Sequence, residues 1–240
     1  PLLCDGYGLA LNFPYLYVTS KRNHRFTIVD ISDPQNPGIT GVCDLDNNLP
    51  TYICYKDSFA YVSANPQGIA IINTADESNP SLETYFSLPF GTRGMGYIEN
   101  YLYTAAGDSI LYILDISEPT NPVLVNTLNT RKKPFALSIS DTLLYVSFQF
   151  NGLEVFNISS PSLPQSVGYY HGTPLLMCNG ITTANGLAYL AADNGVYIFE
   201  YIGGAGKKEE EIQRESKTSI ALNCYPTTFS KKVSIEINSE

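Results

Sequence analysis

Most of the side chains that could bind a charged ligand fall in short polar segments between apolar runs. Of the eight Lys and Arg residues before position 204, all but Lys56 lie in such segments, and so do both histidines. Clustered cations attract carboxylates and phosphates, and a neighbouring aromatic ring adds cation–π contacts. We therefore predict a ligand-binding rim formed by Lys21, Arg22, His24, Arg25, Arg93, Arg131, Lys132, Lys133, Phe148, Phe150 and His171.

Two other kinds of chemistry compete with ligand binding at this rim. An acid–base enzyme would need His24 or His171 within hydrogen-bond reach of Asp44 or Asp46. A calcium loop could use the oxygen atoms of Asp44, Asp46 and Asn48. The Gly and Glu that an EF-hand loop requires are absent from their positions, so we expect no metal site. No dinucleotide-binding, P-loop, zinc or G-x-S-x-G pattern occurs, so we also expect no cofactor.

Charge and composition exclude several classes of function. The 240 residues carry 23 Asp or Glu against 14 Lys or Arg, a net charge of −9. A chain this acidic is not a general nucleic-acid binder. No apolar run reaches the roughly 18 residues that a membrane-spanning helix needs. The five cysteines are too scattered for a disulfide scaffold, so we expect buried thiols.

The elements that must position the rim repeat along the chain. A short apolar segment recurs every 42 to 44 residues, and its shared residues are Tyr17, Tyr61, Tyr103, Tyr145 and Tyr189. A second apolar segment follows each of these and ends in a polar residue: Asp30, Asn73, Asp115, Asn157 or Glu200. A proline comes seven residues after each of the first four polar residues. A period of about 42 residues is that of a β-propeller blade.

Each repeat divides into four strands, which we call a to d. In the third repeat they are predicted at 94–97, 101–105, 110–116 and 123–128. Strand c is nearly all apolar, as expected when both faces of a sheet are buried. We expect the polar residue at its end to accept hydrogen bonds from the following turn. Since one such sheet cannot bury both faces alone, the predicted fold is an all-β propeller of about five four-stranded blades.

The number of blades in the whole protein stays open at this point. A clear strand d follows only four of the five repeats, and residues 1–7 resemble the segment at 174–181. Residues 1–7 would then be the end of a preceding strand d. They could complete the fifth blade and close a five-bladed ring. Alternatively, the chain is a fragment of a larger propeller, which the missing start and the abrupt C-terminal end favour.

Two segments carry a family resemblance. IVDISDPQNP at Ile28–Pro37 and ILDISEPTNP at Ile113–Pro122 resemble the LVIVD repeat, over about residues 1–203. The second and fourth repeats depart from this pattern, with NTADESNP and NISSPSLP at the same place. The resemblance implies a bacterial or archaeal propeller that is exported or exposed at the cell surface. Surface propellers of the YVTN type share the Tyr-Val strand and are the alternative.

The C-terminal part divides into a linker and a short β segment. Residues 204–218 form a highly charged linker that follows a Gly-rich break. Residues 219–240 resemble the start of a type IX secretion C-terminal sorting domain, with the matching residues Tyr225, Pro226 and Phe229 followed by the alternating Val233, Ile235 and Ile237. Thr227 and Thr228 replace the usual Asn-Pro. This resemblance implies that the secretion machinery handles the C-terminus.

These observations favour a non-catalytic, exported or cell-surface propeller that binds a protein or an acidic glycan. In a propeller the b–c turns and the d–a connections emerge at the same end of the blades, here called the top face. Most of the predicted rim residues lie in these turns and connections. The alternatives are an enzyme, a lyase or hydrolase that uses the propeller channel, and a purely structural surface element.

Overall fold

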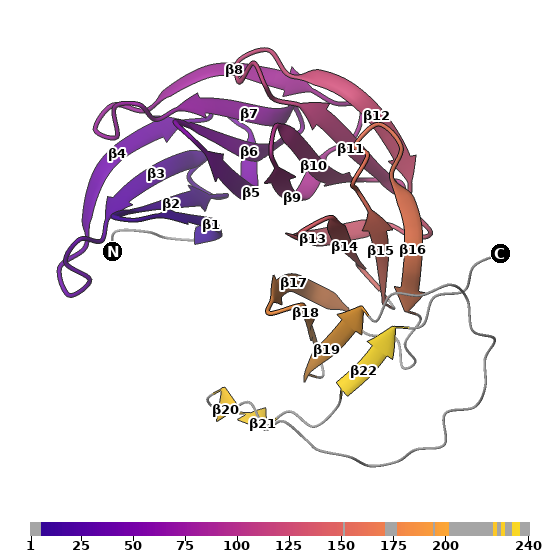
Figure 1. Cartoon of the computed structure of the whole chain (residues 1–240). Helices are drawn as coiled ribbons and strands as arrows, with labels where there is room; N and C mark the ends of the chain where they lie inside the picture. The colour runs from indigo at the N-terminus through magenta and orange to yellow at the C-terminus, as the bar shows by residue number, and fades with distance from the viewer. Residues whose placement is uncertain are drawn as a thin grey trace, which may run out of the picture. The chain divides into compact units, whose positions relative to one another are not determined.

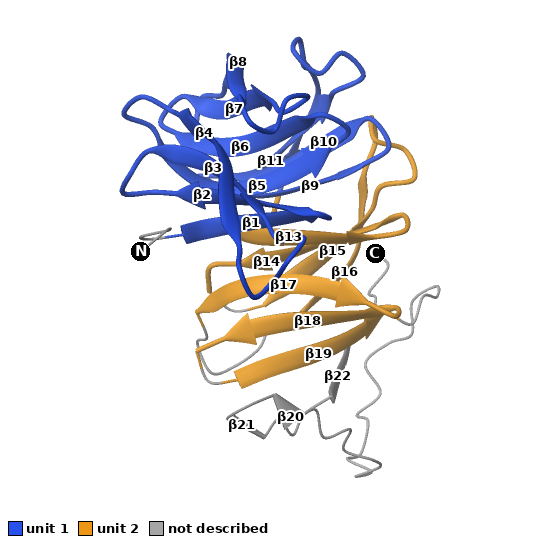
Figure 2. Cartoon of the chain, turned by 90° about the vertical axis from the view of Figure 1, so that its left-hand side faces the viewer, with its two compact units in different colours: residues 1–129 blue, residues 130–240 orange. Residues whose placement is uncertain are grey.

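The computed structural model describes residues 6–150, 152–170, 177–193 and 195–201, together with the backbone of 223–224, 227–228 and 232–235. These residues form an all-β protein with five four-stranded sheets in a five-bladed β-propeller arrangement, and they contain no helix (Figure 1). No helix that could cross a membrane occurs among them. The chain divides into two compact units, Pro1–Asn129 (unit 1) and Thr130–Glu240 (unit 2) (Figure 2).

Unit 1 contains the first three blades, each an antiparallel sheet in chain order. The first is β1 (Gly6–Asn12), β2 (Tyr15–Ser20), β3 (Arg25–Asp30) and β4 (Gly38–Asp44). The second is β5 (Leu49–Lys56), β6 (Phe59–Asn65), β7 (Gly68–Asn73) and β8 (Ser81–Ser87). The third is β9 (Thr92–Ile98), β10 (Tyr101–Ala106), β11 (Ile110–Asp115) and β12 (Val123–Asn129), within one or two residues of the predicted strands. Strands β1, β5 and β9 form the inner edges of these blades (Figure 1).

Unit 2 contains the other two blades. The fourth is β13 (Pro134–Ser140), β14 (Leu143–Phe148), β15 (Leu153–Asn157) and β16 (Gln165–Tyr170). The fifth is β17 (Cys178–Ala184), β18 (Leu187–Ala192) and β19 (Gly195–Tyr201), with β22 (Lys232–Ile235) parallel to β19 in the fourth position. Strands β20 (Asn223–Cys224) and β21 (Thr227–Thr228) form a separate pair.

The predicted role of residues 1–7 as the end of a strand d is wrong for Gly6 and Tyr7. Both belong to β1, which is strand a of the first blade. The outer place in the fifth sheet is taken by β22 from the C-terminal segment. Residues 1–5 lie outside the described residues.

The core follows the repeat. The strand-b tyrosines Tyr17, Tyr61, Tyr103 and Tyr145 are all at most 2% exposed. Within unit 1, Tyr17, Phe26 and Ile28 of the first blade pack with Val62 and Ile72 of the second in one apolar cluster. Burial of apolar surface between neighbouring blades therefore stabilises sheets that could not fold singly.

Four of the five polar residues at the ends of strand c cap the following turn, as predicted, and the turn after Glu200 lies outside the described residues. Asp30, Asn73, Asp115 and Asn157 each accept a hydrogen bond through Oδ1 from the backbone N–H two residues later, at 2.8–2.9 Å. Two blades use a carboxylate and two use an amide at the same position. These hydrogen bonds hold the pKa of Asp30 and of Asp115 below its ordinary value.

This pattern predicts how unfolding depends on pH. A carboxylate whose pKa is lowered by folding stabilises the protein above its unfolded pKa, near 3.9, and this contribution disappears as the pH falls through the folded value. We expect the double variant Asp30→Asn/Asp115→Asn to fold, because Asn73 and Asn157 form the same turn. It should be less stable than wild type at pH 7, and the difference should shrink as the pH falls below the unfolded pKa and the two folded carboxylates take up protons. Urea titrations followed by circular dichroism at several pH values test this. A difference that stays constant from pH 7 to pH 3 would contradict it.

Candidate functional site at the top face

The predicted top face exists in each unit. In unit 1, Leu45 N donates to His24 O at 2.7 Å, which joins the first d–a connection to the first b–c turn. In unit 2, Gln149 N donates to Lys133 O at 3.1 Å and joins the same two kinds of segment. The turns and connections that carry most of the predicted rim residues therefore emerge at the same end of their sheets.

The groups that an acid–base enzyme would use near the first blade have other partners. His24 Nδ1 lies 2.6 Å from Asn48 O, so the imidazole ties the turn to the next connection. Arg25 Nε donates to Asp44 Oδ1 at 2.6 Å across the β3–β4 pair. Both side chains are more than half exposed, so this ion pair contributes about 1 kcal/mol at most. Arg25 thus lies in strand β3 rather than in the turn, and its charge is partly neutralised.

The three residues considered for calcium form hydrogen bonds with different partners. Asp44 accepts the hydrogen bond from Arg25, whereas Asp46 Oδ2 accepts one from the Tyr85 hydroxyl at 3.4 Å. Asn48 is buried, and its Nδ2 donates to Leu45 O at 3.1 Å. Among the residues that the structure describes, no group of three or more His, Cys, Asp or Glu side chains could hold a metal ion.

Arg131 supports the fourth blade. Its backbone N and its Nε each donate to the Glu154 carboxylate at 3.1 Å, and its guanidinium carbon lies 4.2 Å from the centroid of the Tyr169 ring. Ser166 Oγ donates to Glu154 Oε1 at 2.7 Å. Glu154 is only 2% exposed, so loss of Arg131 would leave a buried carboxylate without its cation. This ion pair accounts for Arg131 without any ligand.

The other predicted rim residues of unit 2 divide between surface and core. Phe148 is fully buried, so its predicted place on the rim is wrong: strand β14 carries its side chain into the core. Phe150 is 48% exposed, Lys133 is exposed and Lys132 is half-buried. His171 lies outside the described residues.

Unit 1 brings two of the predicted cations to a pair of tyrosines that sequence reasoning missed. The rings of Tyr7 and Tyr52 meet edge to face, with centroids 5.8 Å apart and an interplanar angle of 78°. Lys21 Nζ lies 5.8 Å from the centroid of the Tyr7 ring. Arg93 is close enough to Tyr52 for its charge to act on the phenol. We call Tyr7, Lys21, Tyr52 and Arg93 the tyrosine–cation cluster.

The electrostatics of Tyr52 reflect this environment. Burial is the main cause that raises the pKa of Tyr52 to about 12, and the neighbouring Tyr7 adds to it. The positive charge of Arg93 acts in the opposite direction. The Tyr52 phenol therefore stays neutral at physiological pH.

The backbone at the cluster is shaped by bulges at the top ends of the inner strands. The strand register shifts between Gly6 and Leu9 in β1 and between Pro50 and Ile53 in β5. A bulge adds a residue and redirects side chains, and a register shift at the same place recurs in strand a of the other three blades. Tyr7 and Tyr52 both lie within these shifts, so they do not follow the alternation of the strands. This irregularity is why strand periodicity alone did not reveal Tyr52.

Comparison with known proteins identifies the repeat. The LVIVD repeat matches residues 9–45, 97–130 and 136–171, which are the first, third and fourth blades. The fourth blade matches although its sequence NISSPSLP departs from the LVIVD pattern. The second blade, which also departs from the pattern, is not matched. No curated protein matches the chain.

Similar solved structures share the fold. A protein from Lactobacillus plantarum is 13% identical with a TM-score of 0.72, and the match covers 82% of this chain and 67% of that one. A functionally unknown protein from Desulfotomaculum acetoxidans is 10% identical with a TM-score of 0.70, covering 82% and 65%. The glutaminyl cyclase of Myxococcus xanthus is 13% identical with a TM-score of 0.54, covering 80% and 90%. The match thus spans about two thirds of the Lactobacillus and Desulfotomaculum proteins. Sequence identities this low show only that the fold is shared.

Proposed function

From the premise that the chain is a β-propeller protein with LVIVD repeats in three of its five blades, we propose that it is a non-catalytic module that binds an acidic ligand at the top face of unit 1. The observation that carries the proposal is the tyrosine–cation cluster, in which Lys21 lies over the exposed ring of Tyr7 and the charge of Arg93 acts on the neighbouring Tyr52, on a chain with a net charge of −9. Cations concentrated at one place on an acidic surface attract anionic partners and favour encounter at that place.

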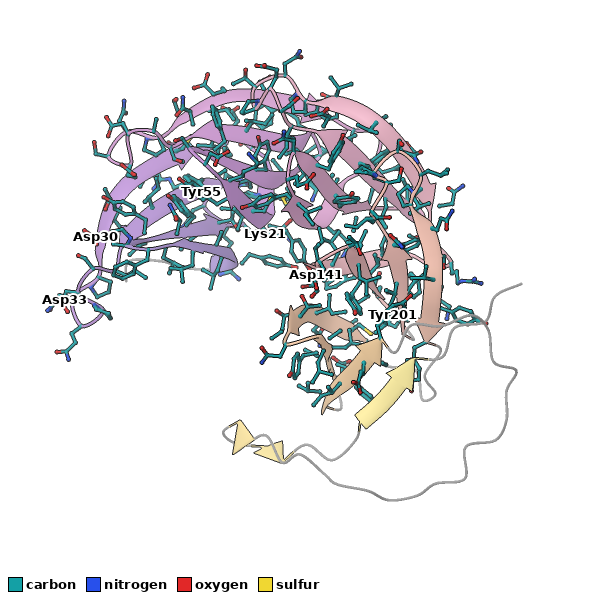
Figure 3. The ribbon with its side chains drawn as sticks, viewed as in Figure 1. Lys21, Asp30, Asp33, Tyr55, Asp141 and Tyr201 are labelled. Carbon is teal, nitrogen blue, oxygen red and sulfur yellow. The ribbon has the colours of Figure 1, made fainter. Side chains whose placement is uncertain are left out.

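The distribution of charge in unit 1 supports this location. Lys21 and Arg22 are exposed in the first b–c turn. The capping carboxylates Asp30 and Asp33 lie at the opposite side of the same blade, at the β3–β4 turn (Figure 3). An anionic ligand at the tyrosine–cation cluster would thus be kept away from Asp30 and Asp33. Asp44 and Asp46 lie on the same top face, where Asp44 is paired with Arg25.

Array binding tests the proposal. We expect wild-type protein to bind acidic glycans or acidic peptides on an array, and Lys21→Ala/Arg22→Ala to weaken that binding at least about tenfold, because each charge-assisted hydrogen bond is worth about 1.5–3 kcal/mol. Lys56→Ala is the matched control, because Lys56 pairs with Asp57 at 2.5 Å and lies at the far end of β5. The proposal fails if no acidic ligand binds, or if both variants bind as wild type does.

Export to the cell surface is the second part of the proposal. It is supported by the LVIVD repeat and by the resemblance of residues 219–240 to the start of a type IX sorting domain, whose Tyr225, Pro226 and Phe229 lie outside the described residues. The expected result is that an amine-reactive reagent that does not enter cells labels the protein on intact cells. Labelling only after lysis would contradict this part.

A further inference from the structure

The tyrosine–cation cluster combines an aromatic face with two cations, which is more than an anion alone requires. The side chain of Tyr7 is 47% exposed, although an aromatic ring stabilises a fold most when it is buried. Its ring contacts Tyr52 edge to face, and the ammonium group of Lys21 lies over the ring. An exposed ring held in this way offers a flat apolar surface beside positive charge.

A sugar acid has the matching chemistry. The axial C–H groups of a pyranose ring form an apolar face that packs on an aromatic ring, and the hydroxyl groups around the edge form hydrogen bonds. A uronic acid adds a carboxylate, which can bind both an ammonium and a guanidinium group. We propose that the tyrosine–cation cluster binds a uronic acid residue of an acidic glycan, with the sugar ring on Tyr7 and the carboxylate on the ammonium group of Lys21.

The backbone around the cluster is held in place before any ligand arrives. Thr19 Oγ1 accepts from Gly8 N at 2.8 Å and donates to Thr51 O at 2.5 Å, so one hydroxyl links β1 to β5 beside the tyrosine pair. Ser63 Oγ donates to Arg93 O at 2.7 Å and links β6 to β9 in the same way. These links join the first blade to the second and the second to the third. A site built on fixed strands loses less conformational entropy on binding than one built on free loops.

A peptide that ends in a carboxylate is the less favoured occupant. Such a ligand would use Lys21 but would not need a flat ring at the position of Tyr7. The two occupants therefore differ in how binding depends on Tyr7, which the experiment uses.

The inference rests on the proposed function, and its test uses the full chain. The probes are tetramers of galacturonic, glucuronic and mannuronic acid, the neutral galactose tetramer and a hexaglutamate peptide, measured by calorimetry at about 50 mM and 500 mM salt. We expect at least one uronate to bind and the galactose tetramer not to bind. Lys21→Ala and Tyr7→Ala should each weaken uronate binding roughly tenfold, whereas Tyr7→Phe should retain it. High salt should weaken binding, because exposed charges are screened.

Two control variants separate the site from general effects. Lys56→Ala removes the same charge at the other end of β5 and should bind as wild type does. Tyr97→Ala removes a tyrosine that is 37% exposed on β9 and should also bind as wild type does. If all uronates fail while hexaglutamate binds and Lys21→Ala abolishes it, the uronic acid assignment is overturned and the proposed function stands. If no probe and no array ligand binds, both fall. Equal uronate binding by Tyr7→Ala and wild type would overturn the role of the tyrosine and with it the inference.

Discussion

Replacing Gly68 with alanine is expected to lower the free energy of unfolding of unit 1 by about 4 kcal/mol, which combines the costs of backbone strain and of overpacking. Gly68 begins β7 with a φ of +114°, a conformation that residues with a Cβ rarely adopt. A Cβ there would lie 2.3 Å from Phe86 O and 2.9 Å from Leu88 N, so the backbone of β8 would have to move. Gly68 O also accepts a hydrogen bond from Thr92 Oγ1 at 2.9 Å, and the shift would disturb this link to the third blade.

Gly38→Ala is the matched control. Gly38 begins β4 in the neighbouring blade, and a Cβ built there meets no atom within 4 Å. We expect its free energy of unfolding to stay within about 0.5 kcal/mol of wild type. Urea titrations followed by circular dichroism and tyrosine fluorescence measure both variants, since the chain has no Trp. Equal denaturation midpoints for the two variants would show that β8 adapts to the added methyl group.

The fold was predictable because the same pattern of apolar strands and polar turn residues recurs in each blade. The apolar strand c and the polar residue at its end predicted both the buried strands and the caps of Asp30 and Asn73. The b–c turns, by contrast, are built in two ways. The second, fourth and fifth blades place a glycine of positive φ at the start of strand c: Gly68, Gly152 and Gly195. The first blade has Arg25 there and places the positive φ on His24 instead.

The candidate site was predictable only in part. The turn composition located Lys21, since charged residues that break a repeat stand out. Arg93 was predicted in a d–a connection but lies in strand β9. Phe148 could not be separated from the rim by composition, because the strand continues to it and buries it. Nor did composition reveal that Arg131 pairs with Glu154, a contact between residues 23 positions apart. Tyr7 was missed because residues 1–7 were predicted as the end of a strand d, and Tyr52 because the strand register shifts beside it.

Two substitutions of Tyr103 are expected to change stability in opposite directions. Tyr103 is fully buried in β10, and its hydroxyl has no hydrogen-bond partner among the described residues. A buried hydroxyl without a partner keeps its desolvation penalty uncompensated. Tyr103→Phe removes that hydroxyl and keeps the ring, so we expect a gain of about 1 kcal/mol in the free energy of unfolding. Tyr103→Ala removes the ring as well and should cost about 4 kcal/mol, because it leaves a cavity between the sheets.

Alkaline pH provides an independent readout of the same hydroxyl. Burial raises the pKa of Tyr103 to about 12, whereas an unfolded tyrosine titrates near 10. The unfolded chain therefore releases this proton at lower pH, and wild type loses stability as the pH rises from about 10 towards 12. Tyr103→Phe has no proton to release there, so its advantage over wild type should grow across this range. Tyr101→Phe, on the same strand, is the control for loss of a phenol that is not fully buried. If Tyr103→Phe is less stable than wild type at pH 7, the hydroxyl has a partner, and the blade core is more polar than these contacts indicate.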